Sequence, residues 1–168
     1  MTTVKRLLLA STLALAPVLL HAQAPATPAL QTLPSKMNLF DLQAQGKDLL
    51  KKARAGRGSA GVTLENYNGH HTMLTARTVS GGAEQHMHFA DFLIIVDGEG
   101  TELTGGKIVD FKEGPNGENK GSKLEGANAT TLKKGDVLHI PAGTPHQSIE
   151  APGQSLVVFV IKVEEPAK

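Results

Sequence analysis

Two patterns of apolar and polar residues divide this chain into two parts. Between residues 39 and 55, apolar side chains recur at the three- and four-residue spacing of an amphipathic helix. Asn38 before this segment and Gly56 after it favour the start and the end of a helix. From residue 61 onward, short apolar or alternating runs are separated by turn residues, a pattern typical of all-β domains. The predicted fold is therefore all-β, a barrel preceded by one N-terminal α-helix.

The predicted strands are residues 62–65, 71–79, 92–96, 101–103, 107–111, 130–132, 137–140 and 156–163. The sequence Asp97-Gly98-Glu99-Gly100 predicts a turn between two of them. Residues 114–121 are polar and predict a mobile surface loop. Gly46 lies in the middle of the predicted helix and costs about 1 kcal/mol relative to Ala. The helix is therefore expected to depend on packing its apolar face against the barrel or a second subunit.

The N-terminus has the pattern of a secretory signal peptide. Lys5 and Arg6 precede an apolar run from Leu7 to Leu20, and Ala22-Gln23-Ala24 is a small-x-small cleavage site. The run is too short for a bilayer-spanning helix, so we expect residues 1–24 to be cleaved and the protein to be periplasmic or secreted, without membrane attachment. Proline-rich residues 25–36 predict a disordered linker, followed by a helical segment at 37–57 and the barrel at 58–168.

Composition narrows the partners and the chemistry. Removing residues 1–24 takes away two of the 17 basic residues and none of the 16 acidic ones, which leaves a net charge of −1 and argues against nucleic-acid binding. The chain has no cysteine, so it has neither disulfides nor thiolate metal ligands. Aromatic residues are scarce, at 4% of the chain, which disfavours a carbohydrate or nucleobase site.

Four side chains in two segments are candidate metal ligands. His86 and His88 are two residues apart, so on a strand both project from the same face. Asp91 is an odd number of residues from both and converges with them only if a bend resets the register. Because Asp91 adjoins the apolar run 92–96, its charge needs a nearby cation, either a metal ion or an Arg or Lys side chain. In the second segment, Pro141 and Gly143 shape a tight loop that directs His146 toward the barrel.

These two segments resemble the motifs of the cupin family. The second cupin motif, Gly-x5-Pro-x-Gly-x2-His-x3-Asn, is matched by Gly135, Pro141, Gly143 and His146, with Glu150 in place of the final Asn. In the first motif, Gly-x5-His-x-His-x3/4-Glu-x6-Gly, His86 and His88 match the histidines, and Asp91 lies at the correct distance from Gly98. Ser80 replaces the leading glycine, and Asp91 follows His88 after only two residues. The resemblance covers about residues 70–163.

The resemblance implies a single-domain jelly-roll barrel with one divalent metal ion, which would be Fe, Mn, Zn, Ni or Cu. His86, His88 and His146 would be its ligands, with Asp91 as a candidate fourth. Glu150 is a candidate catalytic base. Cupins commonly dimerise, so a homodimer with a small-molecule ligand or substrate is expected.

The leading functional hypothesis is a small-molecule metalloenzyme of the dioxygenase, isomerase or decarboxylase type. Two alternatives stay open. One is a non-catalytic barrel that binds a small ligand or a metal, and the other is a structural barrel in which the histidines are only hydrogen-bonded.

Overall fold

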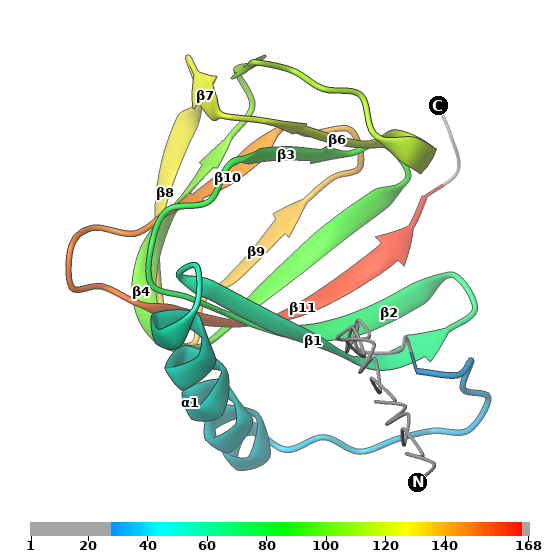
Figure 1. Cartoon of the computed structure of the whole chain (residues 1–168). Coiled ribbons are helices and arrows are strands. Elements are labelled where there is room, and N and C mark those ends of the chain that lie inside the picture. The colour runs from blue at the N-terminus through cyan, green and yellow to red at the C-terminus, as the bar shows by residue number, and fades with distance from the viewer. Residues whose placement is uncertain (1–27, 166–168) are drawn as a thin grey trace, which may run out of the picture.

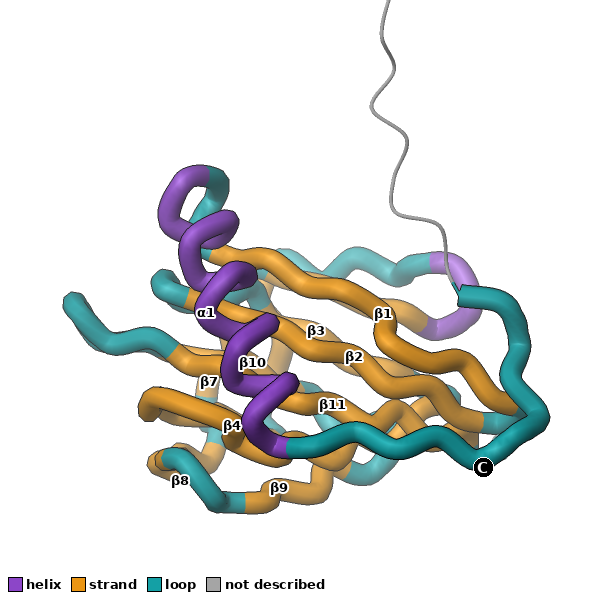
Figure 2. Tube along the Cα trace, turned by 90° about the horizontal axis from the view of Figure 1, so that it is seen from below, coloured by secondary structure: helices purple, strands orange, loops and turns teal. Residues whose placement is uncertain are grey.

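The computed structural model describes residues 28–165, and the predicted signal peptide lies outside them. A curled β-sheet forms the body of the domain, and one helix covers part of its outer surface (Figures 1 and 2). The all-β class with one preceding helix is confirmed. The elements are α1 (Leu39–Ala55), β1 (Ser59–Tyr67), β2 (His70–Arg77), β3 (Ala83–His86), β4 (Phe89–Thr104), β5 (Lys107–Val109), a 3-10 turn (Pro115–Gly117), β6 (Glu118–Gly121), β7 (Lys123–Glu125), β8 (Asn128–Lys133), β9 (Val137–Ile140), β10 (His146–Ile149) and β11 (Leu156–Glu164).

Strand β4 connects the two layers of the barrel. The main sheet has the strand order β1-β2-β11-β4-β10-β3-β6, with β8 and β9 also paired to β4, while β5 and β7 form a separate pair. The first part of β4 pairs with β11 and β9, and the part from Glu99 to Thr104 pairs with β8 and β10. Figure 1 shows β4 curving across the molecule between these neighbours.

The turn predicted at Asp97 to Gly100 is wrong, because β4 continues through it. Gly98 has a φ of +83°, and the pairing with β11 shifts register between Val157 and Val158. The extra residue of this β-bulge bends the strand without ending it. Gly98 therefore allows a bend inside one strand. Its neighbouring residues have the pattern of a turn that connects two strands.

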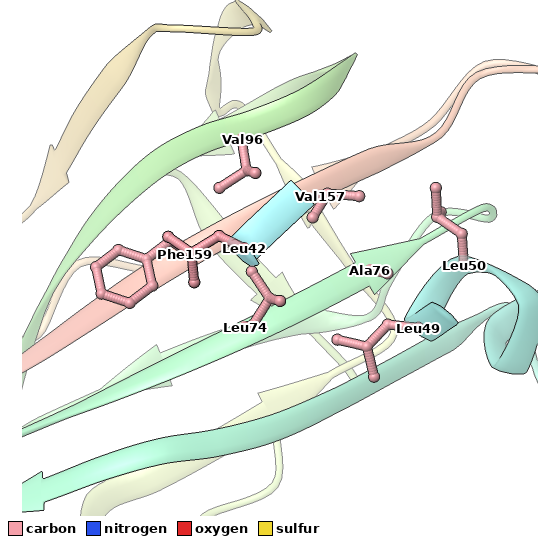
Figure 3. Close-up of a cluster of buried hydrophobic side chains, with 8 residues drawn as sticks. All are labelled: Leu42, Leu49, Leu50, Leu74, Ala76, Val96, Val157 and Phe159. Atoms are coloured by element: carbon pink, nitrogen blue, oxygen red, sulfur yellow. The ribbon is translucent and has the colours of Figure 1, made fainter. Parts of the chain in front are cut away.

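The predicted helix is confirmed as α1. The side chain of Asn38 accepts a hydrogen bond from the backbone N–H of Asp41 and caps its first turn. A Cβ on Gly46 would lie 2.6 Å from Cγ1 of Val157, so this glycine allows the helix to approach β11 closely. The helix thus packs on the barrel, as Figure 3 shows for the cluster formed by Leu42, Leu49, Leu50, Leu74, Ala76, Val96, Val157 and Phe159.

Two segments predicted to lack order make defined contacts. The backbone N–H of Gln31 donates to the carbonyl of Asn66 at 2.7 Å, and the hydroxyl of Tyr67 contacts Ser35 at 3.0 Å. Residues 28–36 of the predicted linker therefore lie against the end of β1. The predicted mobile loop at 114–121 is wrong, because residues 118–121 form β6, which pairs with β3; the disordered linker at 25–36 stays a prediction.

Alternate residues of β2 and β11 point to opposite sides of the sheet, as strand geometry requires. On β11, Val157 and Phe159 face α1, whereas Val158 and Val160 join the interior cluster. That cluster consists of Leu93, Ile95, Leu132, Ile140, Leu156, Val158 and Val160. The barrel therefore has an outer core under the helix and a separate inner wall. No helix in residues 28–165 is long and apolar enough to cross a membrane.

The bend in β4 predicts a specific sensitivity at Gly98. A Cβ there would lie 1.9 Å from the carbonyl oxygen of Ser155, so Gly98→Ala adds a backbone clash to the strain of positive φ. We expect it to lower the free energy of unfolding by about 3 kcal/mol. Gly135→Ala is the matched control, because its φ is +94° and nothing lies within 4 Å of its Cβ position; it should cost about 1 kcal/mol. Equal losses in urea unfolding would contradict the bulge geometry.

Candidate metal centre

A cavity of about 150 Å³ occupies the interior of the barrel. Its apolar wall comes from β2, β4 and β11, whereas β3, β4 and β10 supply most of the polar groups. The polar lining consists of Thr75, Arg77, Glu84, His86, Asp91, Glu102, His146, Gln147, Ser148, Glu150 and Lys162.

His86 and His146 present the same ring nitrogen to one point. Nδ1 of His86 donates to Oε2 of Glu118 at 2.7 Å, and Nδ1 of His146 donates to the carbonyl oxygen of Thr144 at 3.1 Å. A carbonyl oxygen only accepts, so the Nδ1 of His146 carries the proton, and Nε2 of the neutral ring keeps its lone pair. Metal-binding histidines in proteins are usually oriented by a hydrogen bond of this kind from the second nitrogen.

Asp91 lies between the two histidines. Its Oδ2 atom is 3.6 Å from Nε2 of His86 and 3.8 Å from Nε2 of His146. Asp91 is 4% exposed, and Nζ of Lys162 contacts its Oδ1 at 2.7 Å and its Oδ2 at 2.9 Å. The sequence predicted that either a metal ion or an Arg or Lys side chain neutralises Asp91, and the structure shows Lys162 in contact with it. Because a carboxylate accepts about four hydrogen bonds or ligand contacts, Asp91 can hold Lys162 and still face the histidines.

Glu84, two residues before His86 on β3, completes the group. One ligand atom each from Glu84, His86 and His146 lie within 4.8 Å of one another, and Oε2 of Glu84 is 3.9 Å from Nε2 of His86. A tetrahedral ion with bonds of about 2.1 Å holds its ligand atoms about 3.4 Å apart. Side-chain movements of up to about 1 Å would thus bring these imidazoles and carboxylates onto one ion, and the donor types suit a divalent transition metal.

His88 lies outside this group. His88 lies in the bend between β3 and β4 and does not line the cavity. The sequence had predicted that it projects from the same strand face as His86. The bend resets the register of the strand and turns Asp91 inward. The sequence required such a bend for Asp91 to lie near the histidines.

The structure favours a different register for the first motif. Glu84-x-His86-x4-Asp91-x6-Gly98 keeps every interval of the cupin pattern from its first histidine onward, with Glu84 in place of that histidine. If His86 and His88 are taken as the two histidines of the motif, only two residues separate His88 from Asp91, where the cupin pattern has three or four. This interval was the signal in the sequence that could have identified Glu84.

Two further residues of the site were missed by sequence reasoning. Lys162 interrupts the apolar alternation of β11, and its register partner on β4 is Asp91, so strand pairing would have located it. Glu118 belongs to the segment predicted as a mobile loop, and nothing in its local sequence indicates that β6 places it beside His86.

Two further buried carboxyl groups line the same cavity. Glu102 on β4 is 1% exposed and Glu150, just after β10, is 7% exposed. Burial raises the pKa of each to about 7; a hydrogen bond from Ser148 partly offsets this for Glu102, and the charge of Arg77 does so for Glu150. Glu150, the predicted catalytic residue, thus lines the same cavity as the histidines.

Comparison with known proteins identifies the fold. No family model and no curated protein matches the sequence. Among solved structures, the cupin domain of Cnp3 from Schizosaccharomyces pombe aligns with a TM-score of 0.50 at 9% identity, over 66% of this chain and 67% of that one. An uncharacterized double-stranded β-helix protein from Klebsiella pneumoniae gives 0.47 at 14% identity, over 66% and 80%. The alignment with the Cnp3 domain shows that the barrel has the cupin fold.

The DMSP lyase DddQ from Ruegeria pomeroyi DSS-3 aligns with a TM-score of 0.47 at 15% identity, and the match covers 66% of this chain and 49% of the lyase. This chain thus spans about half the length of that protein. At these identities the comparisons establish the fold, and the chemistry has to be argued from the residues in the cavity.

Removing Lys162 tests the neutralisation of Asp91. Lys162→Met leaves a buried carboxylate without its cation and should lower the free energy of unfolding of the metal-free protein by about 3 kcal/mol. Asp91→Asn combined with Lys162→Met should recover most of this loss, because neither charge then remains. Chemical denaturation of both variants measures the difference, and an additive loss in the double variant would show that the pair does not interact.

The buried Glu102 predicts a pH-dependent stability. Its folded pKa of about 7 lies above the ordinary value of 4.5, so the stability linked to its proton is complete below pH 4.5 and is lost as the pH rises through 7. Glu102→Gln should therefore match the parent protein at about pH 4 and exceed its free energy of unfolding by about 3 kcal/mol at about pH 8. Urea unfolding across this range checks it, and a pH-independent difference would refute the assignment.

Proposed function

We propose that this protein is a metal-dependent enzyme of the cupin fold that acts on a small molecule. One divalent ion would be held by His86, His146 and Glu84, with Asp91 beside them. The observation that carries the proposal is that both imidazoles present Nε2 to a common point while their Nδ1 atoms are fixed by Glu118 and Thr144. Two imidazoles and one carboxylate form the donor set of non-haem Fe(II) oxygenases, which favours the dioxygenase among the three predicted reaction types.

The side chains around this point have separable roles. Glu118 and the Thr144 carbonyl keep the rings in the tautomer that binds an ion, and Lys162 fixes the carboxylate of Asp91. A bound ion would supply a Lewis acid with positions open to water, oxygen or substrate. The apolar wall of Leu93, Val158 and Val160 limits the water around a substrate held there.

Glu150 remains our candidate for proton transfer. A carboxyl group with a pKa of about 7 exchanges a proton readily near neutral pH, as a general acid or base requires. Glu102 meets the same condition, and its position opposite Ser148 on β10 places it closer along the strands to His146.

A non-catalytic binding barrel is the second candidate. It is favoured by the ion pair of Lys162 with Asp91, which already neutralises one carboxylate of the site without a metal ion. Such a barrel would retain metal or ligand tightly and show no turnover with oxygen and small substrates. Export and a homodimer are further proposals, and they rest on the sequence alone.

Metal content of purified variants tests the proposed centre. The parent protein should contain close to one equivalent of a divalent transition metal, and His86→Ala, His146→Ala and Glu84→Ala should each reduce metal retention by about tenfold or more. His88→Ala is the matched control and should keep its metal, because His88 lies outside the cavity. Loss in His88→Ala but not in Glu84→Ala would restore the ligand set predicted from the sequence. A parent protein that takes up no ion would overturn the proposal.

A further inference from the structure

The part of the cavity lined by Glu102 and Glu150 lacks hydrogen-bond donors for three of their four carboxyl oxygens. Oε1 of Glu102 and both carboxyl oxygens of Glu150 are buried and have no hydrogen-bond partner among the described residues. Only Oε2 of Glu102 is satisfied, by the hydroxyl of Ser148 at 2.6 Å. Three acceptor oxygens thus line a cavity with nothing to bond.

Such an arrangement is costly unless something fills it. A buried polar atom without a partner typically destabilises a protein by about 1–3 kcal/mol, and an ionised one by more. Burial raises the pKa of both groups to about 7, and the Ser148 hydrogen bond with the charges of His146 and Arg77 offsets this only in part. A ligand that brings positive charge and N–H donors would supply what these oxygens lack.

Arg77 does not fill this role. It lines the cavity from β2, but the described structure contains no ion pair within 4.0 Å between its guanidinium and either glutamate. A Cβ on Gly81 would lie 2.6 Å from Nη1 of Arg77, so the guanidinium is packed closely against the backbone there.

We propose that Glu102 and Glu150 form a second subsite that binds the primary ammonium group of a small ligand. An ammonium group has three N–H donors, which equals the number of carboxyl oxygens without a partner. The inference deepens the proposed function and rests on it, since it assigns the substrate class of the same cavity.

The shape of the cavity sets the rest of the ligand. His146, Ser148 and Glu150 alternate along the chain and all line the cavity. Ser148, the strand partner of Glu102, is two residues or about 7 Å from His146, and Glu150 is four residues or about 13 Å from it. Between the two ends lies the apolar wall of β2 and β11. A volume of about 150 Å³ is close to that of an engineered cavity that accepts benzene. The ligand class is therefore a short aliphatic amine with an oxygen-containing group at its other end, which would reach the metal centre.

The first experiment tests the carboxyl end without the metal. Calorimetric titration of the chelator-treated protein with n-butylammonium and with butan-1-ol compares an ammonium group with a neutral hydroxyl on the same chain. We expect n-butylammonium to bind at least about tenfold more tightly, the effect of charge-assisted hydrogen bonds. Glu102→Gln with Glu150→Gln should abolish this preference, each single variant should reduce it, and Glu113→Gln, an exposed acid, should retain it.

Outcomes of this titration decide the inference. Equal binding of the two compounds, no saturable binding of n-butylammonium, or a preference that persists in the double glutamine variant would overturn it. Misfolding does not confuse the result, because glutamine keeps the shape of glutamate and the single Glu102→Gln change is expected to stabilise the protein at neutral pH and above.

A second titration separates this inference from the proposed metal chemistry. Metal-loaded protein is titrated with 4-aminobutanoate and with pentanoate, which differ by an ammonium in place of a methyl group. Preference for 4-aminobutanoate supports a ligand that spans both ends, and no preference overturns the spanning ligand. An ammonium preference in protein that takes up no metal would leave the subsite standing and refute the proposed function. Metal uptake without any ammonium preference would do the reverse.

Discussion

The bulge in β4 decides which side chains share the interior of the barrel. Asp91 and Glu102 are an odd number of residues apart, so on a regular strand they would face opposite sides of the sheet. The extra residue Val96, two positions before Gly98, reverses this parity, and both carboxyl groups line one cavity. Since β4 pairs with β8, β9, β10 and β11, the same bend also sets the positions of His146 on β10 and Lys162 on β11. Both ends of the cavity therefore depend on one irregularity in one strand.

The two ends of the cavity neutralise their charge differently. At the histidine end, Lys162 contacts both oxygens of Asp91, and Glu118 and Thr144 fix the rings. This end is organised in advance for a small cation, since its donors already converge. At the other end, Glu102 and Glu150 have raised pKa values and oxygens without partners. A cavity with one organised and one unsatisfied end is polarised along its length, which favours a ligand whose own two ends differ.

The sequence predicted those parts of the fold that depend on local pattern, and it missed those that depend on strand pairing. The helix and the apolar strands β9 and β11 follow from periodicity, and His146 follows from a motif whose intervals are all kept. Gly98 was misread because a glycine that bends a strand and a glycine that ends one have the same local sequence. Glu118 and Lys162 reach the site only through pairing across the sheet, which no local pattern reports. Glu84 was within reach, because only its register satisfies the interval to Asp91.

A polar interior of this kind requires that stability come from elsewhere. The inner wall is interrupted by Asp91, Glu102, His146 and Glu150, each of which is costly to bury. The outer face of the same sheet carries the compensating packing, where α1 covers β2, β4 and β11 and Gly46 lets the helix approach Val157 closely. Because the two faces of a strand are set by alternate residues, the outer core can be optimised for packing without changing the inner residues. The packing of the helix on the outer face thus adds apolar burial that helps offset the charged groups in the interior of the barrel.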